Sequence, residues 1–152
     1  MRRACVGLLG IALFVATPAL ATTMLTLDVG QLTRYSNSIV IGDVTAVEVI
    51  ADQPGVPLTR LTVDVSEALK GALEGSVEVL SPGFPGAPEF VSGEQLVLFI
   101  HSEDGVNVLT GFQQGRFGVN ADGTLDRAIP GAGGRSAGNT LEALVQAVQA
   151  AE

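Results

Sequence analysis

Residues 58–69 read LTRLTVDVSEAL and contain the most regular alternation in the chain. Four apolar residues are placed to face one side and four polar residues the other: Leu61, Val63, Val65 and Ala68 against Arg60, Thr62, Asp64 and Ser66. A period of two is typical of a β-strand that buries one face. The stretch therefore predicts a half-buried strand, which Lys70 and Gly71 are expected to end.

The segments on either side continue the β pattern. Residues 39–50 (IVIGDVTAVEVI) are rich in β-branched side chains, and Gly42 within them predicts a bulge. Residues 52–55 (DQPG) form a turn signal between the two strands. Residues 77–80 predict a short third strand, and residues 81–88 (SPGFPGAP) hold too many prolines and glycines for regular structure.

A nearly all-apolar run follows this loop. Residues 95–100 (QLVLFI) predict a central strand that is buried on both faces. Residues 103–105 (EDG) predict a hairpin turn into a return strand at residues 106–110. Further strands are expected at residues 113–119 and 124–128.

A helix is expected at each end of this β region. Leu25, Val29 and Leu32 recur at helical spacing, which predicts a helix over residues 26–35 with Asp28 in its first turn.

A Gly-rich spacer at residues 131–138 is expected to lead into a C-terminal helix at residues 139–151. Asn139 and Glu142 are three residues apart, which is a capping-box arrangement. The apolar stripe of this helix, which we expect to pack on the β region, consists of Leu141, Leu144, Val145 and Val148.

These elements predict a mainly β fold. Seven or so strands that are joined by short turns, without βαβ alternation, close most economically into a barrel or a sandwich. The chain shows no internal repeat, and we predict one domain over residues 22–152.

The first residues have the pattern of a signal peptide. Arg2 and Arg3 precede an uncharged run at residues 4–16, and Ala21 ends a small-x-small sequence. The apolar run is shorter than the roughly 20 residues that a membrane-spanning helix needs. Cys5, the only cysteine, precedes the run, so lipid attachment is not expected. We predict cleavage after Ala21 and a periplasmic or extracellular protein that is not inserted in the membrane.

Cleavage would leave an acidic chain without cysteine. Six basic side chains would stand against sixteen acidic ones, a formal net charge of −10. Nucleic-acid binding requires phosphate neutralisation, so this composition argues against it. Disulfides, thiol catalysis and thiolate zinc sites are excluded after cleavage, and we predict no cofactor.

Three segments together resemble a known family. They are residues 35–50, residues 58–71 ending in Lys-Gly, and residues 90–100, where Ser-Gly-Glu introduces an apolar strand. They are similar to secreted bacterial OB-fold-like domains related to the netrin module and the tissue inhibitors of metalloproteases (NTR/TIMP-like). The resemblance covers about residues 36–119.

The resemblance implies a fold rather than an activity. It implies a small, closed or partly open Greek-key barrel of the OB type over about residues 36–128, with a short N-terminal helix and an amphipathic C-terminal helix. The animal inhibitors chelate zinc through an N-terminal cysteine. The predicted N-terminus here is Thr22, so that mechanism does not carry over.

Two groups of residues are weak candidates for chemistry. His101 with Glu103 or Asp104 has the residue types of a general base and its orienting carboxylate, although a surface role is more common at a strand end. Asn120, Asp122 and Asp126 offer three oxygen ligands around a turn, loosely like a calcium loop, but Asn and Asp are also ordinary turn residues.

The loop at residues 81–90 is the best candidate for recognition. Phe84, Pro85, Pro88 and Phe90 would present apolar groups on a stiff backbone. Alternatively, both phenylalanines fold back and cap an open end of the barrel.

The leading functional hypothesis is an exported, non-catalytic module that binds a protein through barrel loops, with a protease as one candidate partner. The alternatives are a hydrolase built around His101 and a structural component of the envelope. The oligomeric state is left open.

Overall fold

A computed structural model describes residues 25–53, 56–83 and 87–152, and for residues 51–53 and 56 the backbone alone. The predicted signal peptide lies outside the described residues. The fold is mainly β, which confirms the predicted fold class. Among the described residues, no helix combines the length and the apolar character that crossing a membrane requires.

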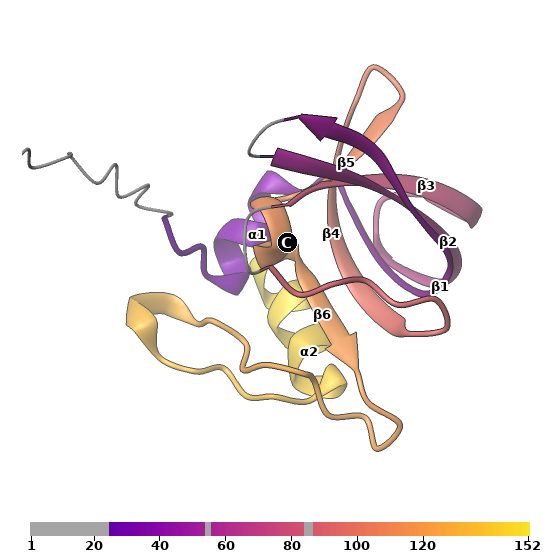
Figure 1. The fold of residues 1–152 in the computed structure, drawn as a ribbon. Helices are drawn as coiled ribbons and strands as arrows, with labels where there is room; N and C mark the ends of the chain where they lie inside the picture. The colour runs from indigo at the N-terminus through magenta and orange to yellow at the C-terminus, as the bar shows by residue number, and fades with distance from the viewer. Residues whose placement is uncertain (1–24, 54–55, 84–86) are drawn as a thin grey trace, which may run out of the picture.

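The elements follow one another along the chain as six strands, two α-helices and two short 3-10 helices (Figure 1). They are α1 (Val29–Tyr35), β1 (Ser38–Gln53), β2 (Val56–Lys70), β3 (Gly75–Pro82), β4 (Gln95–Glu103), β5 (Val106–Leu109), η1 (Phe112–Gly115), β6 (Arg116–Val119), η2 (Ala132–Gly134) and α2 (Leu141–Ala151).

Five strands close into a barrel in the order β1-β2-β3-β5-β4-β1. All neighbouring pairs are antiparallel except β3 and β5, which meet in parallel at Leu80 and Val108. β6 pairs with residues 95–98 at the start of β4, on the same edge as β5, which pairs with residues 100–103. The barrel is thus of the OB type, with β5, η1 and β6 following one edge of β4 in succession.

β4 is the centre of the molecule because it separates two apolar cores. Leu96, Leu98 and Ile100 point into the barrel, where they pack with residues such as Leu61 and Val63. Val97 and Phe99 point outward into a second core. Five consecutive side chains of β4 are fully buried, which agrees with the predicted burial of both faces.

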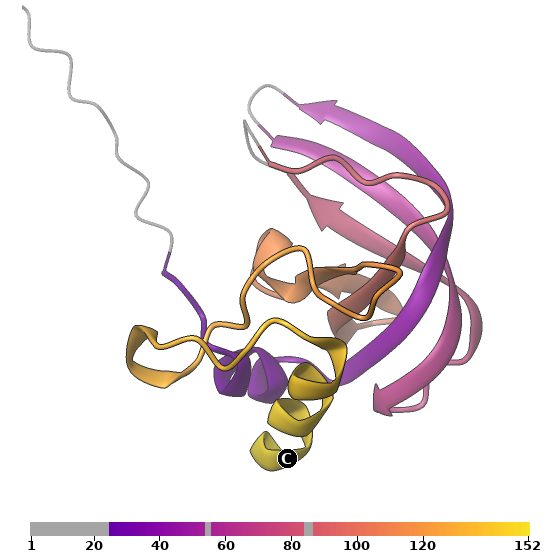
Figure 2. The same ribbon diagram turned by 90° about the horizontal axis from the view of Figure 1, so that it is seen from below.

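The second core is covered by the two helices and by residues 120–140 between β6 and α2, which we call the C-terminal tail (Figures 1 and 2). Leu32 of α1 and Leu144 and Val148 of α2 are buried there. The helical apolar stripes therefore pack against the outside of the barrel wall.

Gly42 lies at an irregularity of β1, where the register with β2 shifts between Ile41 and Gly42. A β-carbon at Gly42 would stand 2.5 Å from the carbonyl oxygen of Asp64. Only glycine permits this close approach of the two backbones, and the predicted bulge is confirmed.

Two strand predictions are wrong in part or in whole. Residues 113–115 belong to η1, because Gly111 and Phe112 adopt positive φ values of 63° and 58° and turn the chain before β6. Residues 124–128 form only isolated bridges, such as Val119 with Leu125. Asp126 bonds there to the backbone of β6 instead of continuing a ladder.

The details of both helix starts also differ from expectation. Asp28 is the N-cap of α1 and forms a capping box with Gln31, so the helix begins at Val29. Thr140, not Asn139, caps α2 by accepting a hydrogen bond from the amide of Ala143. The capping box predicted for Asn139 and Glu142 is therefore wrong.

Smaller corrections concern β2, β3 and the spacer. Ala68 is exposed, because the register of β2 shifts near its end. Ser81 and Pro82 complete β3 instead of belonging to the loop, since they pair with Thr59 and Leu58. The Gly-rich spacer contains η2, and its residue Ser136 forms a bridge with Pro130.

Candidate binding groove at the barrel mouth

A groove of about 480 Å³ lies at the mouth of the barrel, between the β1–β2 hairpin and the segment that leads into β4. Its walls are mainly apolar and include Val47, Val49, Pro57, Ala87, Pro88 and Phe90. Thr59, Glu89 and Gln113 add polar groups. The volume falls in the range of about 300–1,000 Å³ that is usual for ligand sites.

The first wall continues the inner face of the barrel. Val47 stands opposite Leu61, a fully buried residue of the barrel core, and Val49 stands opposite Thr59. The hairpin projects beyond the barrel, so these inward-facing valines reach past the core, and Val49 is 65% exposed. The same alternation that builds the core therefore produces an apolar surface outside it.

The second wall is residues 87–90, which run across the concave side of the hairpin (Figure 2). Phe90 packs against the barrel core, and Gly93 bonds to Val44 of β1 through its amide. The backbone amides of Ala87, Glu89 and Phe90 donate no hydrogen bond to any described residue. This wall is anchored at one end, and three of its backbone amides have no partner among the described residues.

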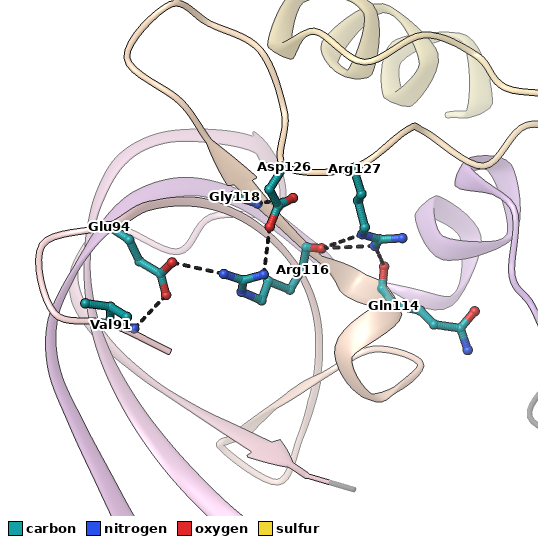
Figure 3. Close-up of polar contacts among 7 residues, drawn as sticks. All are labelled: Val91, Glu94, Gln114, Arg116, Gly118, Asp126 and Arg127. Atoms are coloured by element: carbon teal, nitrogen blue, oxygen red, sulfur yellow. Dashed lines mark hydrogen bonds and ion pairs between the residues drawn. The ribbon is translucent and has the colours of Figure 1, made fainter. Parts of the chain in front are cut away.

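Arg116 holds the second wall in place (Figure 3). Its side chain is 9% exposed and donates to Glu94 at 2.9 Å and to Asp126 at 2.8 Å. Its guanidinium also lies 5.4 Å from the centre of the Phe90 ring. One buried cation thus joins β6, the C-terminal tail and the segment before β4.

Both carboxylates around Arg116 have a second partner. Glu94 accepts the amide of Val91, and Asp126 accepts the amide of Gly118. A β-carbon at Gly118 would stand 2.8 Å from a carboxylate oxygen of Asp126, so a larger residue there would have to displace this carboxylate. The network is rigid because each carboxylate is held from both sides.

Arg127 adds a second, half-buried cation beside the first. Its guanidinium lies 3.9 Å over the Phe117 ring and donates to the carbonyl groups of Gln114 and Arg116. Burial is the main cause that lowers its pKa from the usual value. The sequence analysis missed both arginines; their only signal is that they are two of the six basic residues beyond the predicted cleavage site.

Three buried polar atoms have no hydrogen-bond partner in the described part of the chain: Ser81 Oγ, Gln113 Oε1 and Arg116 Nε. Gln113 lines the groove, Ser81 pairs with the groove residue Thr59, and Arg116 contacts the groove residue Phe90. Gln113 also follows Phe112, whose positive φ is costly for a residue with a β-carbon. Of these three residues, only Gln113 lines the groove itself.

The predicted recognition loop contributes directly to this groove. Pro88 and Phe90 line it, whereas Phe84 and Pro85 lie outside the described residues. Phe90 fits both of the roles that the sequence left open, recognition and capping of the barrel. It packs against the barrel core and also forms part of the groove wall. Val47 and Val49 were not predicted as site residues, because the pattern does not show where the hairpin leaves the core.

His101 lies on the surface of β4, away from the residues that line the groove. Its Nε2 atom is 3.9 Å from Glu103, and both side chains are more than half exposed. Asp104 occupies the hairpin turn with φ of 51°.

Asn120, Asp122 and Asp126 do not converge. Asn120 and Asp122 both bond to Thr124, and the hydrogen bonds that the Thr124 hydroxyl and amide donate to Asp122 hold the pKa of Asp122 below its usual value. Asp126 instead faces Arg116. No group of three or more histidine, cysteine or acidic side chains suited to a metal ion is found within residues 25–53, 56–83 and 87–152.

No protein-family model matches this chain, and no curated protein matches it. The motifs behind the family resemblance have local structural roles, since Gly71 and Gly93 adopt positive φ at the end of β2 and before β4. The relation to the netrin and tissue-inhibitor families stays a prediction.

Proposed function

We propose that the protein is an exported, non-catalytic module that binds an apolar segment of a protein partner in the groove at the barrel mouth. The observation that carries the proposal is the position of Val47 and Val49. They continue the inner face of the barrel into an open groove instead of being covered. A secreted protease is one candidate source of such a segment.

The construction of the groove supports a binding role. Arg116 and its two carboxylates fix the wall that contains Phe90, so the groove is formed without a ligand. A preformed apolar site loses less conformational entropy on binding than a mobile one. The exposed setting of His101 and Glu103 supports a non-catalytic role. Water screens such a pair, and a carboxylate that is itself exposed does not orient the histidine.

Replacing Val49 by lysine tests the site. The full chain is expressed, and the purified protein is used to select binders from a displayed library of random 12-residue peptides. We expect the selected peptides to lose at least tenfold in affinity for Val49→Lys, because a charge in the groove must be desolvated. Fluorescence anisotropy with labelled peptides measures the loss.

Val106→Lys is the matched control. Val106 is also a valine on an exposed strand surface, 46% exposed, but it lies in β5 and does not line the groove. Peptides should bind this variant as they bind the wild type. If the selected peptides bind Val49→Lys and the wild type equally, or if the library yields no binding peptide, the groove is not the site.

Export is tested separately by the mass of the processed protein. When the full chain is expressed in a Gram-negative host, we expect the envelope fraction to contain a product that begins at Thr22. Since Cys5 is the only cysteine, this product should not react with a maleimide after denaturation, whereas the precursor should react once. A thiol-reactive product of full mass in the envelope would contradict cleavage after Ala21.

A further inference from the structure

We infer that the occupant of the groove is a polypeptide in extended conformation, which pairs its backbone with residues 87–89 and places alternate apolar side chains on Val47 and Val49. The inference rests on the proposed function and specifies the class of ligand. Three features support it: the spacing of one wall, the backbone amides of the other wall that have no partner among the described residues, and the polar side chains of the lining.

The spacing of the first wall matches an extended chain. Val47 and Val49 lie two apart on β1, and Pro57 and Thr59 lie two apart on β2. Residues two apart on a strand are separated by about 6.5–7 Å, which is also the separation of alternate side chains in an extended peptide. Apolar side chains at every second position of a ligand would therefore meet this wall in register.

The second wall offers backbone groups for pairing. The amides of Ala87 and Glu89 make no hydrogen bond to described residues, and Pro88 between them has no amide hydrogen. In a ladder, alternate residues direct their N–H and C=O groups to the same side, so a proline between two pairing residues costs nothing. The residue before a proline is also restricted to extended conformations, which prepares Ala87 for pairing. Strand addition of this kind is a common mode of peptide recognition.

The lining of the groove favours a ligand with polar groups, because Thr59, Glu89 and Gln113 contribute polar side chains to it. A peptide group carries both a donor and an acceptor and can bond to such groups, whereas a purely apolar molecule cannot. The lining therefore favours a polypeptide over a lipid or hydrocarbon in the same space.

Charge adds one element of selectivity. Among the described residues that line the groove, Glu89 is the only one with a charged side chain; it is exposed, and no ion pair to another described residue is found for it. The chain beyond Ala21 has a formal charge of −10. We therefore expect the bound segment to carry a lysine or arginine beside its apolar residues, and its affinity to fall with added salt.

Methylation of single backbone nitrogens in a selected peptide provides the first test. Each N-methyl group removes one donor, so pairing predicts a period of two: about tenfold weaker binding at alternate positions and little change at the positions between them. A scrambled peptide of the same composition, without alternation, is expected to bind at least tenfold more weakly than the parent.

The second test uses the protein side of the same hydrogen bonds. Glu89→Pro removes the amide hydrogen and the carboxylate, whereas Glu89→Ala removes only the carboxylate. We expect about tenfold weaker binding for Glu89→Pro than for Glu89→Ala. Circular dichroism checks that both variants are folded, and the N-methyl series gives an independent answer if Glu89→Pro does not fold.

The outcomes separate this inference from the proposed function. Peptides that depend on Val49 but tolerate N-methylation at every position, and bind Glu89→Pro and Glu89→Ala equally, would overturn backbone pairing and leave the groove as a site for side chains alone. Peptide binding that does not change when Val49 is replaced by lysine would overturn both the inference and the proposed function. Period-two sensitivity together with the difference between the Glu89 variants would establish strand addition.

Discussion

Arg116→Met is expected to lower the free energy of unfolding by about 3 kcal/mol, near the lower end of the cost of breaking a buried ion pair. Methionine replaces the aliphatic part of the arginine side chain but leaves the carboxylates of Glu94 and Asp126 without their cation. Their side chains are 21% and 33% exposed, so water compensates in part. The loss of the contact with Phe90 adds to the effect.

A triple variant distinguishes the charge from the packing. Arg116→Met combined with Glu94→Gln and Asp126→Asn has no unpaired charge, while each new amide keeps an oxygen for the bond to Val91 or Gly118. Since replacing all members of a buried charge network is far less costly than removing one, this variant should recover most of the lost stability.

Urea denaturation followed by circular dichroism measures both variants. If Arg116→Met unfolds at the same urea concentration as the wild type, the network does not stabilise the fold. If the triple variant is no more stable than the single one, the contribution of Arg116 is packing and not charge. Either result would also weaken the view that the groove wall is preformed.

Phe99→Ala is expected to destabilise the protein by about 3–5 kcal/mol, the usual cost of truncating a buried phenylalanine. Phe99 is fully buried in the outer core, and its ring centre lies 5.9 Å from that of Phe117. The helices and the tail would have to move to fill the cavity, and their connections to β4 limit that movement.

Leu98→Ala extends this prediction to the other face of β4. Leu98 is next in sequence but lies in the barrel core, so its truncation should also cost about 2–5 kcal/mol. Val106→Ala is the control and should change stability by no more than about 0.5 kcal/mol, because Val106 is exposed. The same urea denaturation measures all three variants. A small effect for either Phe99 or Leu98 would show that one of the two cores contributes little.

Several parts of the fold could be predicted because their signals are local. The alternation in β2 is the pattern of a strand with one buried face, and the apolar run in β4 is the pattern of a strand with two buried faces. Both patterns can be recognised within a few residues. Asp104 and Gly105, both with positive φ, form the predicted hairpin turn. The bulge at Gly42 was also predictable, because a glycine within a strand usually marks a close approach or an irregularity.

The wrong predictions fall where a residue's role depends on distant partners. Residues 124–128 have apolar residues that suit a strand, but Asp126 is drawn to Arg116 and Gly118 and no ladder forms. The chain near Gln113 turns because η1 must link β5 and β6 along one edge of β4. Neither constraint is visible within a window of a few residues.

The candidate site was predicted only in half. Pro88 and Phe90 could be proposed because two phenylalanines flank prolines in this loop, and that pattern is local. Val47 and Val49 could not, because on a strand they look like core residues. Their exposure results from the length of the β1–β2 hairpin beyond the barrel.

The sequence by itself determined that this chain forms strands, where most of them lie, and that two helices flank them, because side-chain periodicity and turn residues act over a few positions. Only the tertiary structure decided which strands are neighbours, that two cores lie on either side of β4, and that Arg116 joins segments far apart in the chain. Those outcomes depend on burial and charge pairing between residues that the chain brings together only when the barrel closes. The groove belongs to this second class, since it exists only between elements that the closed barrel places face to face.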